Sequence, residues 1–287
     1  MKHRKEAPVR KKRSWIPGLT LLIVCAIWLI PTLGLLVTSF RKADDALSTG
    51  WWTALAKPFD TSQWTLSNYD EVLSGEGMAS AFINSLVITI PSTIIPIMIA
   101  AFAAYAFTFM KFPGRDTMFI VLVGLLVVPI QVAFIPLLSL FNGMGLTGQF
   151  ATVWLAHTGF GMPLAIYILR NYMQGLPAEI IESAKVDGAS HFTTFWRLIV
   201  PMSVPALAAF AIFQFLWVWN DLIVALVFLD RKNEAVTMNL SNLVGNLGQD
   251  WNLLTAGAFI TMAVPLLVFV SLQRYFVRGL TAGSVKG

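Results

Sequence analysis

The residues able to do chemistry in this 287-residue sequence gather in one polar, charged stretch, Gly175–Pro201, between two long apolar runs. Glu179 and Glu182 fall in the first turns of a short helix that we expect Pro177 to begin, where carboxylates suit the helix dipole. Gly188 then permits a sharp break. Such a stretch suits hydrogen-bonded docking onto another protein, whereas the plainer interpretation is an amphipathic interfacial loop.

The helix expected before Gly188 is amphipathic. Its apolar side chains form an uneven stripe of Ile180, Ile181, Ala184 and Val186. A second short helix is expected over roughly residues 192–198, leading into the next apolar run. Residues 175–201 therefore form an elbow of two short helices joined at a glycine.

The sequence contains no set of residues typical of a catalytic or metal-binding site. The three histidines, His3, His157 and His191, are scattered, and the single cysteine, Cys25, lies in an apolar run. There is no His-Glu-x-x-His spacing and no Walker A loop, so the chain is not expected to bind and hydrolyse ATP by itself. We therefore expect no enzymatic activity, no cofactor and no metal, and an energy source in a partner or an ion gradient.

A few hydrogen-bonding side chains lie inside the apolar runs. The candidates to line or gate a solute pathway are Gln131, Gln214, Trp219, Asn220 and Asp221. Asp221 is the only carboxylate within an apolar run, and an intramembrane acid is a functional candidate because its burial is costly. Two interpretations of Asp221 stay open, a structural cap and a pathway-lining group. Core packing is the alternative for the aromatic residues and for His157.

Composition indicates an integral membrane protein, because 56% of the residues are hydrophobic and 12% are charged, against about 25% charged in soluble domains. Six apolar runs are each long enough to cross a hydrocarbon core of about 20 helical residues. They lie near residues 15–40, 82–109, 117–140, 150–169, 199–229 and 253–273. The sequence therefore predicts an all-α protein with six transmembrane helices. The fifth run is longer than needed and is expected to be tilted, or broken near Pro201 and Pro205.

The distribution of basic residues predicts the orientation. With the N-terminus inside, the inner segments hold 15 of the 20 Lys and Arg residues. We therefore expect both termini and the elbow on the cytoplasmic side. Residues 1–14 are interpreted as a basic cytoplasmic tail that precedes a permease domain over 15–287. The basic residues flank apolar runs without a basic–aromatic face, so no nucleic acid is expected as a partner.

The elbow resembles the EAA loop of ABC importer permeases. The carrying residues are Glu182-Ser183-Ala184, three further residues, Gly188, nine residues, and then Leu198-Ile199-Val200-Pro201. The family pattern has the same spacing, with mild replacements at Ser183, Leu198 and Val200. The resemblance implies that this loop fits a cleft on a cytoplasmic ATPase and couples it to the membrane. The coupling residues it implies are Glu179, Glu182, Ser183, Ala184, Asp187, Gly188 and Pro201.

Other segments resemble the sugar-type permeases of that family. They are Ala103–Phe107 with Lys111–Arg115, Val128–Gln131, Ile135–Leu137, Trp219-Asn220-Asp221 and Gly279–Gly287, the last similar to the tail of the smaller maltose-permease subunit. The likeness covers residues from about 15 to the end.

The resemblance implies a type I permease subunit of an ATP-driven importer for a carbohydrate, an oligosaccharide of the maltose or α-glucoside kind. Implied partners are a second permease subunit, an ATPase dimer, an extracytoplasmic sugar-binding protein and the lipid bilayer of a bacterial or archaeal cytoplasmic membrane. The alternative is an ion-coupled secondary transporter, which is expected to show several intramembrane ionisable groups or repeated halves.

Overall fold

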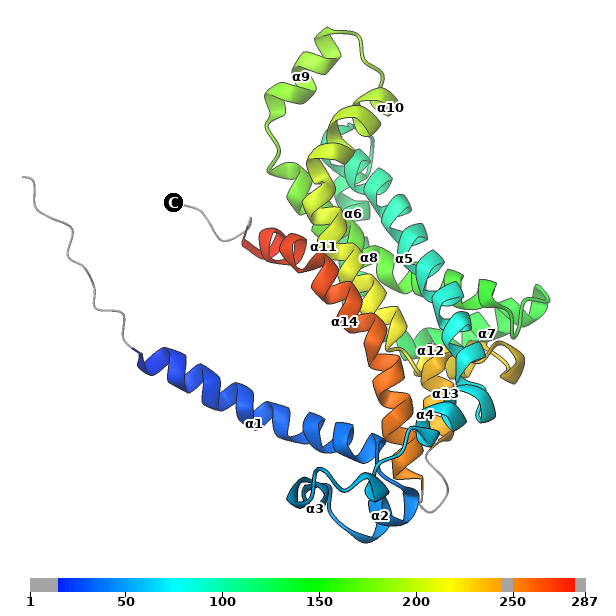
Figure 1. The fold of residues 1–287 in the computed structure, drawn as a ribbon. Coiled ribbons are helices and arrows are strands. Elements are labelled where there is room, and N and C mark those ends of the chain that lie inside the picture. Colours follow the sequence, from blue (N-terminus) through cyan, green and yellow to red (C-terminus); the bar gives the residue numbers. More distant parts are fainter. Residues whose placement is uncertain (1–14, 244–249, 282–287) are drawn as a thin grey trace, which may run out of the picture.

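The computed structural model describes residues 15–243 and 250–281, with side chains described as far as Gln273 (Figure 1). These ranges are helical and contain no strand, only the two isolated β-bridges Arg41–Trp64 and Gly148–Leu229. The basic tail, with His3, and the last residues of the similar C-terminal segment lie outside the described residues.

Five helical segments of the described chain are long and apolar enough to cross a membrane, and the number is six if one bent pair of helices is counted as a span. The long helices are α1 (Ile16–Ser39), α5 (Met78–Phe109), α8 (Phe150–Gln174), α11 (Val200–Trp219) and α14 (Trp251–Thr281). This confirms the all-α fold class expected from the sequence.

The expected run at 117–140 is not one straight helix. The pair consists of α6 (Arg115–Gly124) with its 3₁₀ turn Leu125–Val127 and, after the 3₁₀ turn Ile130–Ala133, α7 (Phe134–Gly143), and its two halves meet at 99°. The cause is Pro129, since a residue before proline is pushed out of the helical region. Val128 is accordingly extended, with φ −76° and ψ 121°.

The fifth span continues through its prolines. α10 (His191–Thr194) runs through a π-helical turn, η5 (Phe195–Ile199), directly into α11. In this turn the Val200 N–H bonds Phe195 O, one residue further back than in an α-helix. The expected break near Pro201 and Pro205 is therefore wrong, and the chain breaks instead at residues 220–222, before α12 (Ile223–Phe228).

The middle of the molecule is formed by α5, which packs against α8 and α11, while α11 also packs against α14. Small side chains make the closest approach possible, because they bring helix backbones together. Four alanines of α5 and α8 are buried in one cluster: Ala100, Ala101, Ala104 and Ala165.

Gln214 of α11 closes a gap that a proline opens in α5. Pro96 has no N–H, so the carbonyl of Ser92, four residues earlier, loses its intrahelical donor. Gln214 Nε2 donates to Ser92 O at 3.1 Å, and its side chain is 1% exposed. The amide lies against Gly161 of α8, where a Cβ would stand 2.7 Å from Gln214 Oε1. One side chain thus joins three helices.

The same arrangement recurs at two other prolines. Trp154 Nε1 donates to Val87 O at 3.0 Å, four residues before Pro91, and Trp219 Nε1 donates to Thr261 O at 3.1 Å, four residues before Pro265. Backbone groups freed by proline in a membrane helix need such a partner. These contacts fix α5 to α8 and α11, and α11 to α14.

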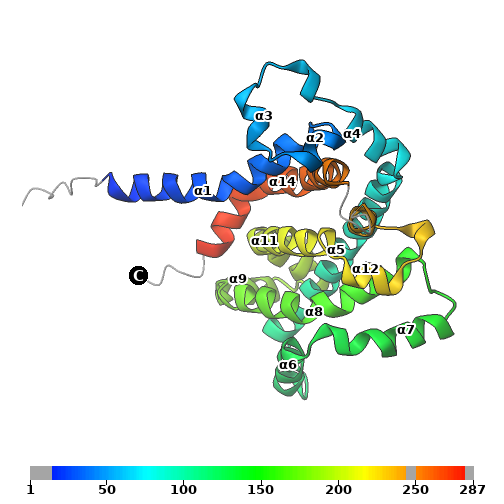
Figure 2. The ribbon, with the colours of Figure 1, turned by 90° about the horizontal axis from the view of Figure 1, so that it is seen from below.

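The short helices gather at the end of the bundle opposite the elbow (Figures 1 and 2). They are α2 (Ala43–Ser48), α3 (Trp52–Ala56), the 3₁₀ turn Thr61–Gln63, α4 (Ser67–Asp70) with the π turn Glu71–Gly75, the 3₁₀ turn Arg231–Asn233, and α13 (Val236–Asn242). From the same end, α1 extends away from the other helices, and only 6% of its most apolar 18-residue window is buried.

Candidate functional site

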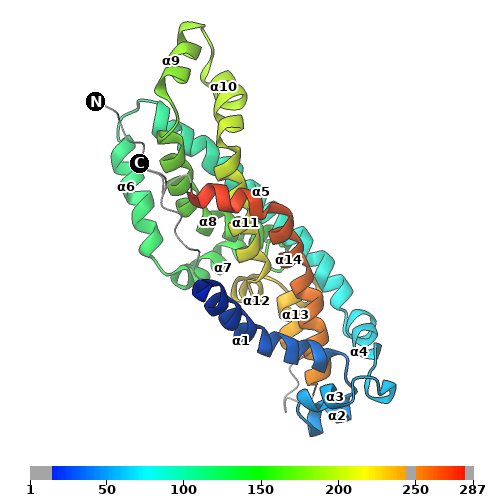
Figure 3. The same ribbon diagram turned by 60° about the vertical axis from the view of Figure 1, so that its left-hand side comes forward.

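The elbow projects beyond the ends of α5 and α8 (Figures 1 and 3). Its first arm is α9 (Ala178–Val186), which begins one residue after the expected start because Pro177 is the cap, with ψ 122°. Its second arm is α10 with η5, which begins at His191, where Ser190 Oγ accepts the N–H of Thr193 at 3.2 Å. The second arm is therefore the start of the fifth span rather than a separate short helix.

Gly188 turns the chain between the two arms. Its φ is +75°, a left-handed conformation that glycine adopts without the usual steric cost. The Gly188 N–H bonds Lys185 O at 3.1 Å and the Ala189 N–H bonds Ala184 O at 2.9 Å, which together satisfy the last carbonyls of α9. The sharp break expected at this residue is confirmed.

The implied coupling residues divide between two surfaces. Ala184 is buried, beside Ile181, where α9 meets the rest of the chain. The remaining ones, Glu179, Glu182, Ser183, Asp187, Gly188 and Pro201, are exposed. The Glu182 carboxylate forms no hydrogen bond or ion pair with any residue that the structure describes. It is accordingly available to a partner.

Two apolar side chains at the tip of the elbow were not singled out as site residues by sequence reasoning. Val186 is 88% exposed and Phe192 is 67% exposed, although the sequence placed Val186 in the buried stripe of α9. The helix turns Val186 away from Ile181 and Ala184, five and two positions earlier. Exposed valine and phenylalanine beside an unpaired carboxylate are typical of a docking surface. A helical-wheel projection of α9 would have placed Val186 on a different face from Ile181 and Ala184.

A groove of about 440 Å³ runs between the two arms. Its wall includes Ile180, Ser183, Asp187, Thr193 and Arg197. Glu182 and Val186 are not among the residues that line this groove, so the groove and the exposed surface of these two side chains are separate features of the elbow.

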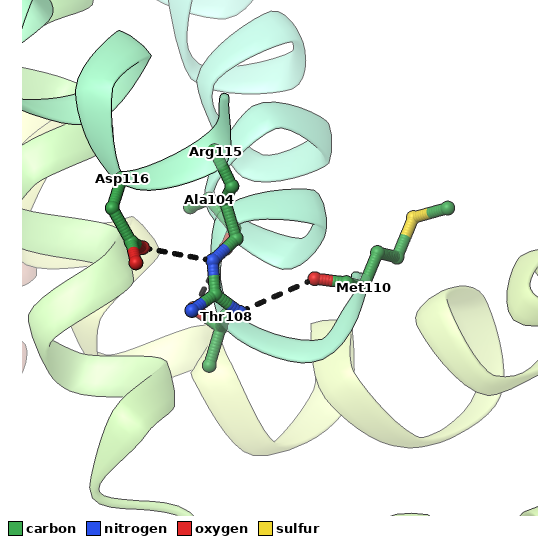
Figure 4. A network of polar contacts seen from close by, with 5 residues as sticks. All are labelled: Ala104, Thr108, Met110, Arg115 and Asp116. Atoms are coloured by element: carbon green, nitrogen blue, oxygen red, sulfur yellow. Dashed lines mark hydrogen bonds and ion pairs between the residues drawn. The ribbon is translucent and has the colours of Figure 1, made fainter. Parts of the chain in front are cut away.

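Polar contacts also fix the neighbouring turn between α5 and α6 (Figure 4). Arg115 Nε donates to Asp116 Oδ1 at 3.0 Å, and its Nη1 donates to Met110 O at 3.4 Å. Thr108 Oγ1 donates to Ala104 O at 2.7 Å within the last turns of α5. The end of α5 nearest the elbow is therefore held in one conformation.

The candidate pathway residues do not form one lining surface in this conformation. Gln214 and Trp219 are buried and bond the carbonyls freed by prolines, which supports the packing interpretation for both. Gln131 is exposed just past the 99° bend. Asn220 Nδ2 donates to Leu216 O at 2.7 Å at the end of α11. Gln214, Trp219, Gln131 and Asn220 therefore lie in four different environments.

Asp221 has the geometry of a cap. Its Oδ2 accepts the N–H of Ala225 at 3.2 Å in the first turns of α12, and its backbone carbonyl accepts the hydroxyl of Thr237 at 2.7 Å. His157 Nε2 lies 3.8 Å from the same Oδ2, too far for a hydrogen bond. His157 is buried against the edge of Trp217, with ring centroids 5.0 Å apart, which agrees with the packing role expected for it. The hydrogen bond expected with that role is not found, because Nδ1 has no partner among the described residues.

Among the described residues no group of three or more His, Cys, Asp or Glu is arranged to hold a metal ion. The side chains of the elbow offer carboxylates, hydroxyls and apolar surface, which can bind another protein. They do not bring a nucleophile and a base together.

Comparison with known proteins adds a family to this geometry. The family described as "Binding-protein-dependent transport system inner membrane component" matches residues 96–282. The "Osmoprotective compounds uptake permease protein GgtD" of a Synechocystis strain is 58% identical over 282 residues, covering 96% of this chain and 95% of that protein. The "Alpha-glucoside transport system permease protein AglG" of Rhizobium meliloti is 43% identical, covering 97% and 98%.

A solved structure shares the fold. A chain of a bacterial ABC transporter involved in the import of the acidic polysaccharide alginate superposes with a TM-score of 0.71 at 18% sequence identity, covering 94% of this chain and all of that one. The arrangement of the helices described above is thus one that an importer subunit adopts.

Proposed function

We propose a function that follows from family membership, because this chain belongs to the binding-protein-dependent transport system inner membrane components. It is a membrane-spanning permease subunit of an ABC importer and not itself an enzyme. Such a subunit forms half of a solute pathway together with a second permease chain. ATP is hydrolysed by partner ATPase subunits, and an extracytoplasmic binding protein delivers the solute. Nothing in the comparisons favours the ion-coupled alternative.

The solute we propose is a carbohydrate of the α-glucoside class. The support is the 43% identical permease of an α-glucoside transport system, matched along nearly its whole length. A trehalose transport permease of Mycobacterium tuberculosis, SugB, is 34% identical over 78% of this chain. The names of these two relatives agree with the resemblance of several segments of this sequence to sugar-type permeases.

The elbow is the part that we propose docks onto the ATPase. The observation that carries this proposal is the exposed, unpaired Glu182 beside the exposed Val186, on a helix that projects beyond the bundle. A charge-assisted hydrogen bond donated by a basic group of the ATPase to the Glu182 carboxylate contributes about 1.5–3 kcal/mol. Its loss weakens binding roughly ten- to hundredfold.

The test uses the complete transporter, purified with its second permease chain and ATPase and supplied with its binding protein. Glu182→Ala and Gly188→Val are expected to reach the membrane at normal levels, and to lose ATPase on co-purification or to uncouple ATP hydrolysis from uptake of an α-glucoside. Valine at φ +75° costs about 1–2 kcal/mol and re-aims the second arm. No atom lies within 4 Å of the added Cβ, so crowding is not the cause.

Two matched variants serve as controls. Glu179→Ala removes an exposed carboxylate from the same helix; Glu179 is one of the candidate coupling residues, but no position of the family pattern falls on it, so its effect is expected to be smaller. Gly188→Asn introduces a residue that tolerates the left-handed conformation, and it is expected to restore most of the function lost in Gly188→Val. Full ATPase recovery and normal uptake in both Glu182→Ala and Gly188→Val would show that the elbow is not the coupling element.

A further inference from the structure

The second arm of the elbow is fastened to α5 by a buried tyrosine. Tyr105, near the end of α5, is 4% exposed, and its hydroxyl lies 2.9 Å from Nδ1 of His191, the first residue of α10. A buried hydroxyl requires a hydrogen-bond partner, and the imidazole supplies it. The two residues are 86 positions apart in the sequence, so this bond joins two helices that are distant along the chain.

An aromatic cluster continues the same contact. Phe195 of η5 stacks on Phe102 of α5 with ring centroids 4.3 Å apart, and its ring meets Tyr105 edge-on at 5.5 Å. Trp196 meets Phe102 edge-on at 5.8 Å and Phe195 at 5.2 Å. Stacked and edge-on pairs have preferred geometries, so the cluster restricts rotation of the arm about α5. The π-helical turn contributes both residues of the second arm that contact Phe102, and Phe192 of α10 meets Trp196 edge-on at 6.2 Å.

The first arm is held differently. Ile181 and Ala184 are its buried residues, and they make apolar contacts only. The side-chain hydrogen bond that the structure records for this helix, Ser183 Oγ to Glu179 O at 2.7 Å, stays within it. Since Gly188 stands between the arms, the first arm can change its angle while the second arm keeps its bond to α5.

Movement of α5 reaches further helices through the carbonyls that its prolines free. Ser92 O is bound by Gln214 of α11, and Val87 O is bound by Trp154 of α8. Directional hydrogen bonds and close packing hold these three helices together as a unit. Because the second arm continues directly into α11, its displacement reaches α11 along the chain. It reaches α5 through the Tyr105–His191 bond and the aromatic cluster, and α8 through α5.

We propose that Tyr105 and His191, together with Phe195, are positioning residues for transport that make the second arm of the elbow and α5 move as one body. This inference rests on the proposed docking of the elbow onto the ATPase. In it, Glu182 and Val186 receive the ATPase, the second arm passes the motion directly into α11, and the Tyr105–His191 bond passes it into α5. Loss of the bond is expected to leave docking intact and to reduce the solute carried per ATP.

The experiment measures three quantities in the reconstituted transporter: ATPase recovered on co-purification, ATP hydrolysed, and α-glucoside taken up. Tyr105→Phe keeps the ring and removes the hydroxyl. His191→Ala removes the ring nitrogen that pairs with the hydroxyl, and His191→Asn keeps an amide group, able to donate or accept, near the position of Nδ1. We expect normal ATPase recovery in all three, with solute carried per ATP reduced roughly fivefold in the first two, the ratio that one ordinary hydrogen bond corresponds to, and largely restored in His191→Asn.

The pair is tested by combination and by a matched control. If the two residues act through each other, Tyr105→Phe combined with His191→Ala lowers the ratio no further than either single change. Tyr167→Phe removes an exposed hydroxyl of α8 for which the structure records no hydrogen bond, and it is expected to transport normally. If Tyr105→Phe lowers the amount of folded protein, His191→Ala carries the test, because His191 is exposed.

The outcomes separate this inference from the proposed function. A normal ratio of solute to ATP in Tyr105→Phe and His191→Ala, alongside failure of Gly188→Val, overturns the role of the tyrosine–histidine bond and leaves the docking proposal standing. Additive losses in the double variant also overturn it. Normal transport in Glu182→Ala and Gly188→Val overturns the docking proposal itself.

Discussion

The hydrogen bond from Gln214 to Ser92 O is expected to stabilise the protein, because it satisfies a carbonyl that Pro96 leaves without an intrahelical donor. Gln214→Met keeps the length of the side chain and removes the donor to Ser92 O. The Ser92 carbonyl then stays buried without a partner, because Pro96 cannot donate to it. An unsatisfied buried acceptor costs about 1–3 kcal/mol in proteins, and measured hydrogen bonds between membrane helices average about 0.6 with a maximum near 1.7 kcal/mol. We expect a loss of about 1 kcal/mol.

Pro96→Ala provides the compensating change. The alanine restores an N–H at the position from which α5 can bond Ser92 O within the helix. Gln214→Met in the Pro96→Ala background is therefore expected to cost less than Gln214→Met alone, with a coupling free energy of about 1 kcal/mol in the double-mutant cycle. The measurement is thermal or denaturant unfolding of the purified protein in mixed micelles, with all four variants compared at equal detergent.

Additive effects of the two changes would refute this reasoning, since they would mean that Gln214 stabilises the protein by some contact other than the Ser92 carbonyl. The contact with Gly161 is the obvious one, because its Cα lies against the amide of Gln214. Gln214→Met places a methyl group there, and its crowding cost appears equally in the Pro96 and Pro96→Ala backgrounds. The double-mutant cycle therefore cancels this crowding cost, and it does not contribute to the coupling free energy.

Two further predictions concern Asp221 and the orientation of the chain. Asp221→Asn keeps an acceptor for the Ala225 N–H and is expected to leave thermal stability within about 0.5 kcal/mol, whereas Asp221→Ala is expected to cost about 1–2 kcal/mol as a lost cap does; reduced transport at normal stability in Asp221→Asn would favour the pathway interpretation instead. A reporter fused after Gly188 is expected to be cytoplasmic and one fused after Gly248 external, as the 15-to-5 bias of basic residues predicts, and the reverse pair of signals would contradict the docking of the elbow.

The number and kind of elements were predictable from the sequence, because apolar runs of this length have few alternatives in a membrane. The left-handed turn at Gly188 was predictable as well, since a glycine ends an amphipathic helix there. The bend before Pro129 was missed, and a break was considered instead near Pro201 and Pro205, because a proline within an apolar run does not by itself show whether the helix ends there. A proline leaves the helix intact when a π turn or a neighbouring side chain takes over the freed backbone groups.

The roles of Gln214 and Trp219 depended on packing that the sequence does not express. Each is a hydrogen-bonding residue in an apolar run. Such a residue can line a pathway or bridge two helices, and the local sequence looks the same in both cases. Only the position of a proline on another helix decides between the two. The pairing of Tyr105 with His191 was hidden for the same reason, as the two residues are 86 positions apart. The coupling role of the elbow residues stays a prediction.

The 99° bend between α6 and α7 restricts what can surround this span. Val128 and Pro129 are extended in the middle of an apolar run, so the regular helical hydrogen bonding is interrupted there, although the 3₁₀ turns on either side still use Leu125 O and Pro129 O. Acyl chains offer no hydrogen bond, and an unsatisfied group facing them costs several kcal/mol. We therefore expect water or another protein chain, rather than lipid tails, to border any carbonyl of this corner that lacks a donor.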